Sequence, residues 1–203
     1  MLNSGRHPSR EESFLPFQSK APALFTFHLF PPGLTSCAVA DIEPPDTHHV
    51  NAALGWLELE NPREAAEELK KLSAEADAHP KVMEVWWMIH ARQRNWEAAL
   101  TAARGLIAAA PDNPAGWIDQ SFSLHELRRT QEAWDELLPA ATRFPKVAVI
   151  PYNLACYACQ LGHPREAMKW LKIAIKLDGA ENVKERASVD PDLAPLRGQI
   201  ENM

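Results

Sequence analysis

The strongest constraint on this chain is an alanine that returns every 34 residues. Ala65, Ala99, Ala133 and Ala167 stand at that constant separation, and the strings around them are alike, for example Asn61-Pro-Arg-Glu-Ala-Ala-Glu-Glu-Leu69 and His163-Pro-Arg-Glu-Ala-Met-Lys-Trp-Leu171. Equal spacing over four units is the signature of a repeat protein, in which each unit completes its core against its neighbours. The units are predicted to run 46–79, 80–113, 114–147 and 148–181.

Each unit is predicted to be a pair of helices. In the fourth unit a first helix runs from Tyr152 to Leu161, and Gly162 ends it in the left-handed conformation that glycine accepts at a helix C-terminus. Proline at the first position of the next helix loses no hydrogen bond, because that amide has no partner within the helix. In the first unit Asn61 is predicted to cap the second helix, with Glu64 in the capping box. These signals predict an all-α fold.

This pattern resembles the tetratricopeptide repeat over residues 46–181. The matching residues in the third and fourth units are Trp117, Ser121, Leu124, Ala133, Leu137, Ala140, Pro145, Leu154, Ala155, Ala158, Ala167, Leu171 and Ala174. Trp87 and His90 depart from the pattern, since the family has a small residue and a large apolar residue there. The resemblance implies a right-handed α-solenoid of four helix-turn-helix repeats, and a protein-binding function.

Residues 182–203 are predicted to form a final capping helix. Asp190 is its expected N-cap, and Pro191 stands at the first helical position. Leu193, Leu196 and Ile200 would cover the apolar face of the last repeat, which a solenoid must cover to stay soluble.

Residues 1–45 differ from the rest of the chain and are predicted to be an extended or disordered leader. They hold seven of the 17 prolines, which forbid a long helix. An apolar stretch followed by Cys37 leaves a lipidated export signal open as an alternative, although Glu11 and Glu12 precede it. The expected location is the cytoplasm, and the alternative is an exported lipoprotein anchored through Cys37.

Composition excludes several function classes. The net charge of −6 argues against a nucleic-acid partner, because phosphate binding needs clustered Lys and Arg. Three cysteines cannot form a disulfide framework in a chain of 203 residues. No apolar run reaches the roughly 20 residues of a membrane-spanning helix.

Cys156 and Cys159 form the one motif that invites a catalytic interpretation. A redox pair needs a helix N-terminus or a cation to lower a thiol pKa, and these two cysteines fall in the middle of a predicted helix. A zinc site would need further ligands, for which His163 and His125 are the candidates. We therefore predict structural cysteines, no catalytic residue, no metal and no cofactor.

The first helix of every pair is expected to line a concave groove. Carrying over the family's groove positions gives the predicted binding residues Val50, Leu54, Glu84, Val85, Met88, Ile118, Asp119, Phe122, Tyr152, Asn153 and Cys156. The lysines with which some family members clamp a terminal carboxylate are missing, since Val50, Glu84, Ile118 and Tyr152 stand in their places. The groove is apolar with acidic spots, which suits a hydrophobic peptide or helix carrying a basic residue.

Three occupants of the groove remain open at this point: a partner peptide, a second copy of the chain, and the leader around Phe25 and Phe30. The predicted function is a non-catalytic interaction module or scaffold. A secretion chaperone or lipid-anchored envelope assembly factor is the alternative, and an enzyme is the third hypothesis.

Overall fold

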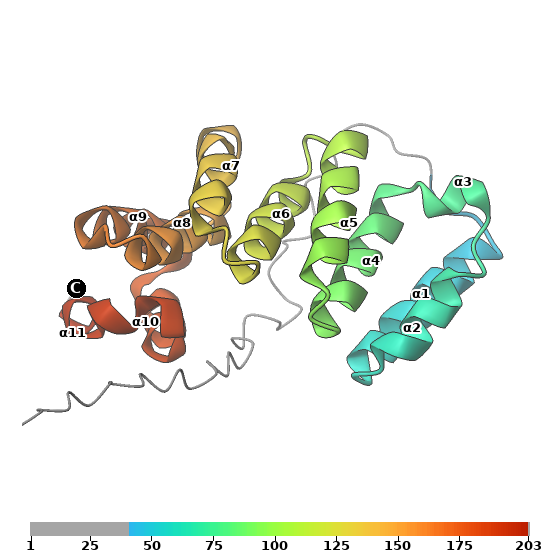
Figure 1. Ribbon diagram of the computed structural model, residues 1–203, viewed down its shortest axis with the longest axis horizontal. Helices are drawn as coiled ribbons and strands as arrows, with labels where there is room; N and C mark the ends of the chain where they lie inside the picture. The colour runs from blue at the N-terminus through green and yellow to red at the C-terminus, as the bar shows by residue number, and fades with distance from the viewer. Residues whose placement is uncertain (1–40, 203) are drawn as a thin grey trace, which may run out of the picture.

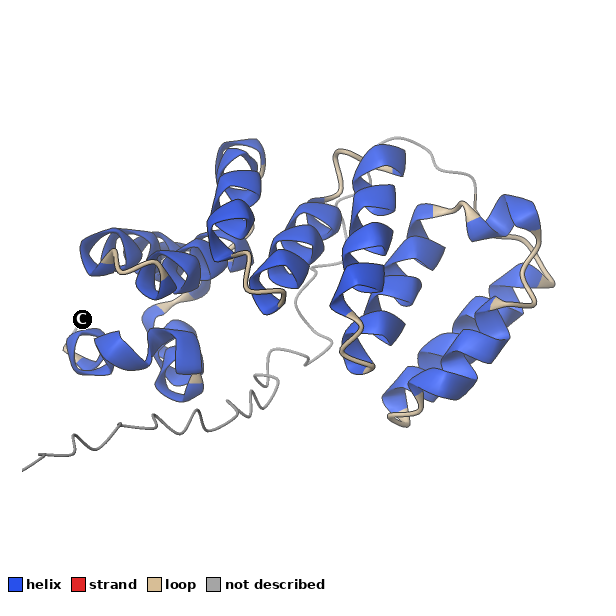
Figure 2. Cartoon of the chain, in the orientation of Figure 1, coloured by secondary structure: helices blue, strands red, loops and turns tan. Residues whose placement is uncertain are grey.

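The computed structural model describes residues 41–202, and all regular secondary structure in that range is helical (Figure 2). The predicted leader up to residue 40 lies outside the described residues, together with Phe25, Phe30 and Cys37. The helices are α1 (Asp46–Glu58), α2 (Pro62–Leu69), α3 (Ala74–Asp77), α4 (Pro80–Arg92), α5 (Trp96–Ala109), α6 (Pro114–Glu126), α7 (Thr130–Arg143), α8 (Val149–Gln160), α9 (Pro164–Asp178), α10 (Ala180–Val189) and α11 (Arg197–Glu201), with a 3₁₀ helix, η2 (Pro191–Leu196), before α11.

Four helix pairs follow one another along the long axis of the molecule: α1 with α2, α4 with α5, α6 with α7, and α8 with α9 (Figure 1). The second helix of one pair packs against the first helix of the next, as α5 does on α6 and α7 on α8. The predicted all-α solenoid is confirmed. None of the helices between residues 41 and 202 combines the length and the hydropathy needed to cross a bilayer.

The turn inside each pair has the same backbone geometry four times. Glu60, Arg94, Arg128 and Gly162, spaced by 34 residues, have φ angles of 56°, 57°, 66° and 79°. The residue after each of them donates its amide to a carbonyl five positions back, at 2.8–2.9 Å. This is the bond of a Schellman motif, which closes a helix C-terminus. Gly162 therefore ends α8 as predicted, and three residues with a Cβ adopt the same left-handed conformation.

The alanines that define the repeat lie in the interior of the helix pairs. Ala65, Ala99, Ala133 and Ala167 are fully buried. Neighbouring pairs approach each other closely at Gly116, where an added Cβ would come within 2.8 Å of the Ile107 side chain. Small residues thus set the distances between helices, because a larger side chain there would force the helices apart.

Within residues 41–202 the apolar core divides into two clusters. A smaller cluster joins α1, α2 and α4 and includes Leu57, Leu69 and Ile89. A larger cluster starts at Leu100 in α5 and continues to Ile200 in α11. The third and fourth pairs therefore share their core with the segments that follow them.

Within the described residues, three helical segments follow α9 where the sequence predicts one capping helix. Asp190 caps η2 as expected, since its carboxylate accepts the amide of Asp192 at 2.9 Å. Helix α10 precedes it, however, and Pro195 stands inside η2. The two apolar contacts of α10, Val183 and Ala187, are too few to predict an amphipathic helix.

Candidate functional site

The face formed by α1, α4, α6 and α8 is the inner surface of the solenoid. These first helices contact one another more closely than the second helices do. An array bends toward the side on which its elements lie closest, so the first helices line the concave side. All the predicted binding residues lie on these four helices.

In the first two pairs the predicted residues are divided between the surface and the core. Leu54 and Met88 are partly exposed and pack on the rim of the smaller core cluster. Val50 and Val85 are only 1% and 2% exposed, and they lie inside that cluster. The assignment of Val50 and Val85 to an open groove is therefore corrected: these side chains point between α1, α2 and α4 and fill the core.

An aromatic cluster crosses from α4 to α6 at the middle of the inner surface. Phe122 lies edge-on to Trp87, with ring centroids 6.3 Å apart, and to Trp96, at 5.7 Å. The indole nitrogen of Trp87 donates to the Ser123 hydroxyl at 3.0 Å. These contacts fix the rings, and all three remain partly exposed. Trp96 belongs to a second helix, so a groove pattern restricted to first helices misses it.

Two carboxylates stand beside this cluster. The Glu84 carboxylate accepts a hydrogen bond of 2.6 Å from Asn113, and burial still raises the pKa of Glu84. Asp119 is buried, and among the described residues no group donates a hydrogen bond to its carboxylate. Its desolvation, followed by the negative charge of Glu84, raises the pKa of Asp119 well above its usual range. Ile118 beside it is also buried and packs into the larger core, which corrects its assignment to the open groove.

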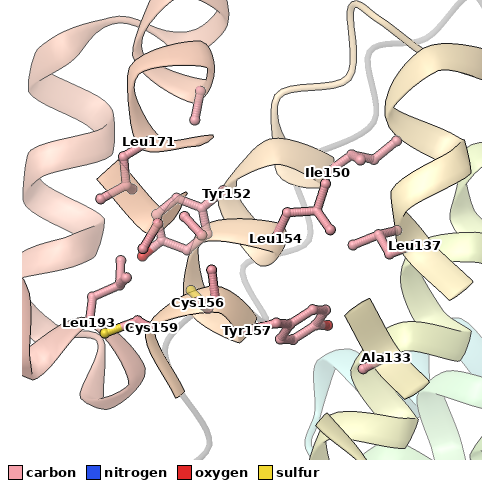
Figure 3. Packing of buried hydrophobic residues seen from close by; sticks show 14 of the residues in the cluster. Ala133, Leu137, Ile150, Tyr152, Leu154, Cys156, Tyr157, Cys159, Leu171 and Leu193 are labelled. Atoms are coloured by element: carbon pink, nitrogen blue, oxygen red, sulfur yellow. The ribbon is translucent and has the colours of Figure 1, made fainter. Parts of the chain in front are cut away.

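In the fourth pair the predicted residues are covered. Tyr152, Asn153 and Cys156 are 1%, 7% and 4% exposed. Figure 3 shows Tyr152 and Cys156 within a packed cluster that also contains Leu193 of η2. The expectation of an open groove here is corrected, because η2 packs on α8 and occupies its inner face.

The covering segment is tied to the inner helices by polar contacts. The Tyr152 hydroxyl donates to the Asp190 carboxylate at 2.9 Å, and the Cys156 thiol lies 3.6 Å from the same oxygen. His125 Nε2 of α6 lies 3.0 Å from the Asp192 carboxylate. In the sequence Asp190 looks like an ordinary helix cap. The residues around Asp190 and Asp192 give no sign of their contacts with side chains on α6 and α8.

The two cysteines of the fourth pair are reduced and buried. Burial raises the pKa of both thiols, and the charge of Asp190 adds to the effect at Cys156. A thiol of raised pKa is a poor nucleophile at neutral pH. Between residues 41 and 202 there is no group of three or more His, Cys, Asp or Glu side chains arranged to hold a metal ion.

Several solved structures have a fold similar to that of this chain. PilF of Pseudomonas aeruginosa matches with a TM-score of 0.64 and 19% identity, over 77% of this chain and 69% of that one. A thermophilic TPR protein of Thermus thermophilus matches at 0.59 and 14% identity, over 77% of this chain and 95% of that one. The fold is that of the tetratricopeptide repeat (TPR) proteins. The TPR protein MamA is also similar, with a TM-score of 0.61 and 14% identity over 68% of this chain and 81% of its own. No protein-family model and no curated protein matches the sequence.

Proposed function

We propose that this protein is a non-catalytic scaffold that binds an apolar peptide or helix carrying a basic residue, on the inner surface of α1, α4 and α6. The observation that carries the proposal is the pair of carboxylates Glu84 and Asp119 on neighbouring first helices. Asp119 is buried without a donor from the described part of the chain, and the charge of Glu84 makes it costlier to ionise. A Lys or Arg side chain from a partner would supply the compensating positive charge.

The surroundings of the two carboxylates suit the apolar part of such a partner. Leu54, Met88 and Phe122 lie along the same face, one pair apart. A few well-packed side chains near the centre of a binding surface carry most of its affinity. A TPR fold presents such a face along several repeats, which is the geometry that an extended or helical segment requires.

The buried thiols support a non-catalytic function. Cys156 and Cys159 are the nucleophile candidates that the sequence singles out, and both have raised pKa values. Their side chains pack within the larger core cluster, where they act as small apolar residues.

The proposal is tested by selecting ligands for the full-length chain from a displayed random peptide library. Enriched peptides are expected to combine apolar residues with at least one Lys or Arg. The double variant Glu84→Gln, Asp119→Asn should bind a selected synthetic peptide at least about tenfold more weakly, because loss of a partly buried charge pair costs about 2–5 kcal/mol.

A matched control makes the same change of charge elsewhere. Glu97 in α5 and Asp135 in α7 are exposed on second helices. The double variant Glu97→Gln, Asp135→Asn should keep wild-type affinity. Enrichment of peptides without basic residues, or equal losses in the two double variants, would refute the proposal.

A further inference from the structure

The segment from Asp190 to Ile200, called here the latch, does not continue the solenoid in the way that the helix pairs do. In the third and fourth pairs the first helix packs mainly on the second helix of the preceding pair, as α6 does on α5 and α8 on α7, and only lightly on the preceding first helix. Helix α10 keeps to this rule by packing on α9, whereas η2 packs on α8. The latch therefore turns from the end of the array onto its inner surface.

The inner helices hold the latch through polar contacts of the kind that hold a bound peptide, to both its side chains and its main chain. Its Asp190 carboxylate accepts from Tyr152, and its Asp192 carboxylate pairs with His125. Gln160 at the end of α8 donates to the main-chain carbonyl of Asp192 at 2.9 Å. The donors come from two neighbouring first helices, α6 and α8, so the latch bridges the third and fourth repeats.

The apolar contacts of the latch are confined to one side. Leu193 and Leu196 are 0% and 2% exposed, and the intervening Ala194 and Pro195 are exposed. Residues three apart on a 3₁₀ helix lie above one another, so the two leucines form a single ridge that enters the core. A short acidic segment with leucines at this spacing fits the surface.

Two features of the latch favour its dissociation from the surface of α6 and α8. Helix α11 has five residues, which is too short for a helix to persist without tertiary contacts. Asp190 is buried, and its desolvation raises the pKa of its carboxyl despite three donors. Part of the favourable contact energy is thus offset by the cost of burying a charge.

We propose that the latch is an internal ligand, and that the surface it covers on α6 and α8 binds a partner segment of the same chemistry, Asp-x-Asp-Leu-x-x-Leu, once the latch is displaced. This surface is rich in hydrogen-bond donors, whereas the surface on α4 and α6 carries carboxylates. The proposal goes beyond the function argued above, because it concerns a second subsite with the opposite preference of charge.

The test uses the full-length chain and a fluorescent synthetic peptide that spans residues 188–203. A tethered ligand has an effective concentration in the millimolar range, so the wild type should bind the free peptide weakly. The variant Leu193→Ser, Leu196→Ser, which weakens the latch, should bind it at least about tenfold more tightly. Control substitution of the exposed Gln199 by Ala should leave binding at the wild-type level.

Three further variants test whether the latch is a displaceable ligand or a fixed part of the core. In the weakened-latch background, Tyr152→Phe removes only the hydroxyl donor and should lower peptide affinity, as should His125→Ala. The milder latch variant Asp192→Asn removes the pairing with His125 and should give a smaller increase in binding. Failure of the peptide to bind a variant that is still helical by circular dichroism would overturn the proposal. So would loss of α6–α9 whenever the latch is weakened, since the segment would then be part of the core.

The basic peptide selected for the α4 and α6 surface serves as a second probe in each variant. If it binds while the latch peptide does not, this proposal fails and the proposed function stands. If the latch peptide binds and no basic peptide can be selected, the reverse holds.

Discussion

Asp119 is a carboxylic acid that the fold keeps where its negative charge is costly. It lies on α6, buried, beside the aromatic cluster and within reach of the charge of Glu84. A carboxyl whose pKa is raised in the folded state favours folding when it is protonated. Its contribution is fully present below the pKa of the unfolded chain, about 3.9 for aspartate, and is lost as pH rises through the higher folded value.

The variant Asp119→Asn should therefore be more stable than the wild type at pH 7. We expect a gain of about 1 kcal/mol or more in the free energy of unfolding, because the amide removes a charge that desolvation and Glu84 make costly. The gain should shrink as pH is lowered toward 4, because the wild-type carboxyl then becomes protonated in the folded protein. Urea unfolding at several pH values measures this, with exposed Asp135→Asn as the control. A gain that does not change with pH would contradict the expected role of the charge.

At the scale of the structural element, the turn inside each helix pair is the most regular feature. Four turns place a residue in the left-handed region, and only the fourth uses glycine. A side chain with a Cβ in that region costs roughly 1–2 kcal/mol, which glycine avoids at some entropic cost in the unfolded chain. The first three turns are held by the same backbone bonds in spite of this strain.

Exchanging the residues at these turns should change stability in opposite directions. Glu60→Gly should raise the free energy of unfolding by about 0.5–1 kcal/mol, and Gly162→Ala should lower it by about 1 kcal/mol. Steric crowding does not cause the expected loss of stability in Gly162→Ala, because an added Cβ at Gly162 meets no atom within 4 Å. Thermal unfolding of the two variants decides the matter, and a stabilising Gly162→Ala would show that the turn is not strained.

The ends of helices could be predicted where capping residues coincide with the 34-residue repeat, as at Asn61 and Gly162. The candidate site was predictable only by position along the helices. The difference between partly exposed Leu54 and buried Val50 depends on the crossing angle between pairs, which a sequence pattern does not specify. The latch was missed for a related reason: Asp190 satisfies the local rule for a helix cap, and its contact with Tyr152, 38 residues away, has no local signature.

At the scale of the whole molecule, stability is expected to be uneven along the array. In the described part of the chain, the first pair belongs to the smaller core cluster and has a neighbouring pair on one side, whereas α8 and α9 are packed between α7 and the segments that follow them. The stability of a solenoid is approximately the sum of its units and of the interfaces between neighbours. Opening of the first pair therefore breaks the fewest stabilising contacts and is expected to cost the least free energy.

Hydrogen exchange followed by mass spectrometry should show this gradient. Amides of α1 and α2 are expected to exchange at least about tenfold faster than those of α8 and α9, which corresponds to a difference of about 1.4 kcal/mol in opening free energy. The same chain unfolded in urea serves as the reference for fully exposed amides. Uniform protection from α1 to α9 would show that the two core clusters unfold as one unit.

The placement of α10 and η2 also sets the direction in which copies of this molecule can assemble. Head-to-tail stacking into a filament requires an uncovered face at both ends of the array, and here α10 lies on α9 while η2 lies on α8. A second copy could stack on α9 only in the place that α10 occupies. Association through the opposite end, at α1 and α2, would join two like faces, and such a contact produces a closed two-fold pair instead of a growing polymer.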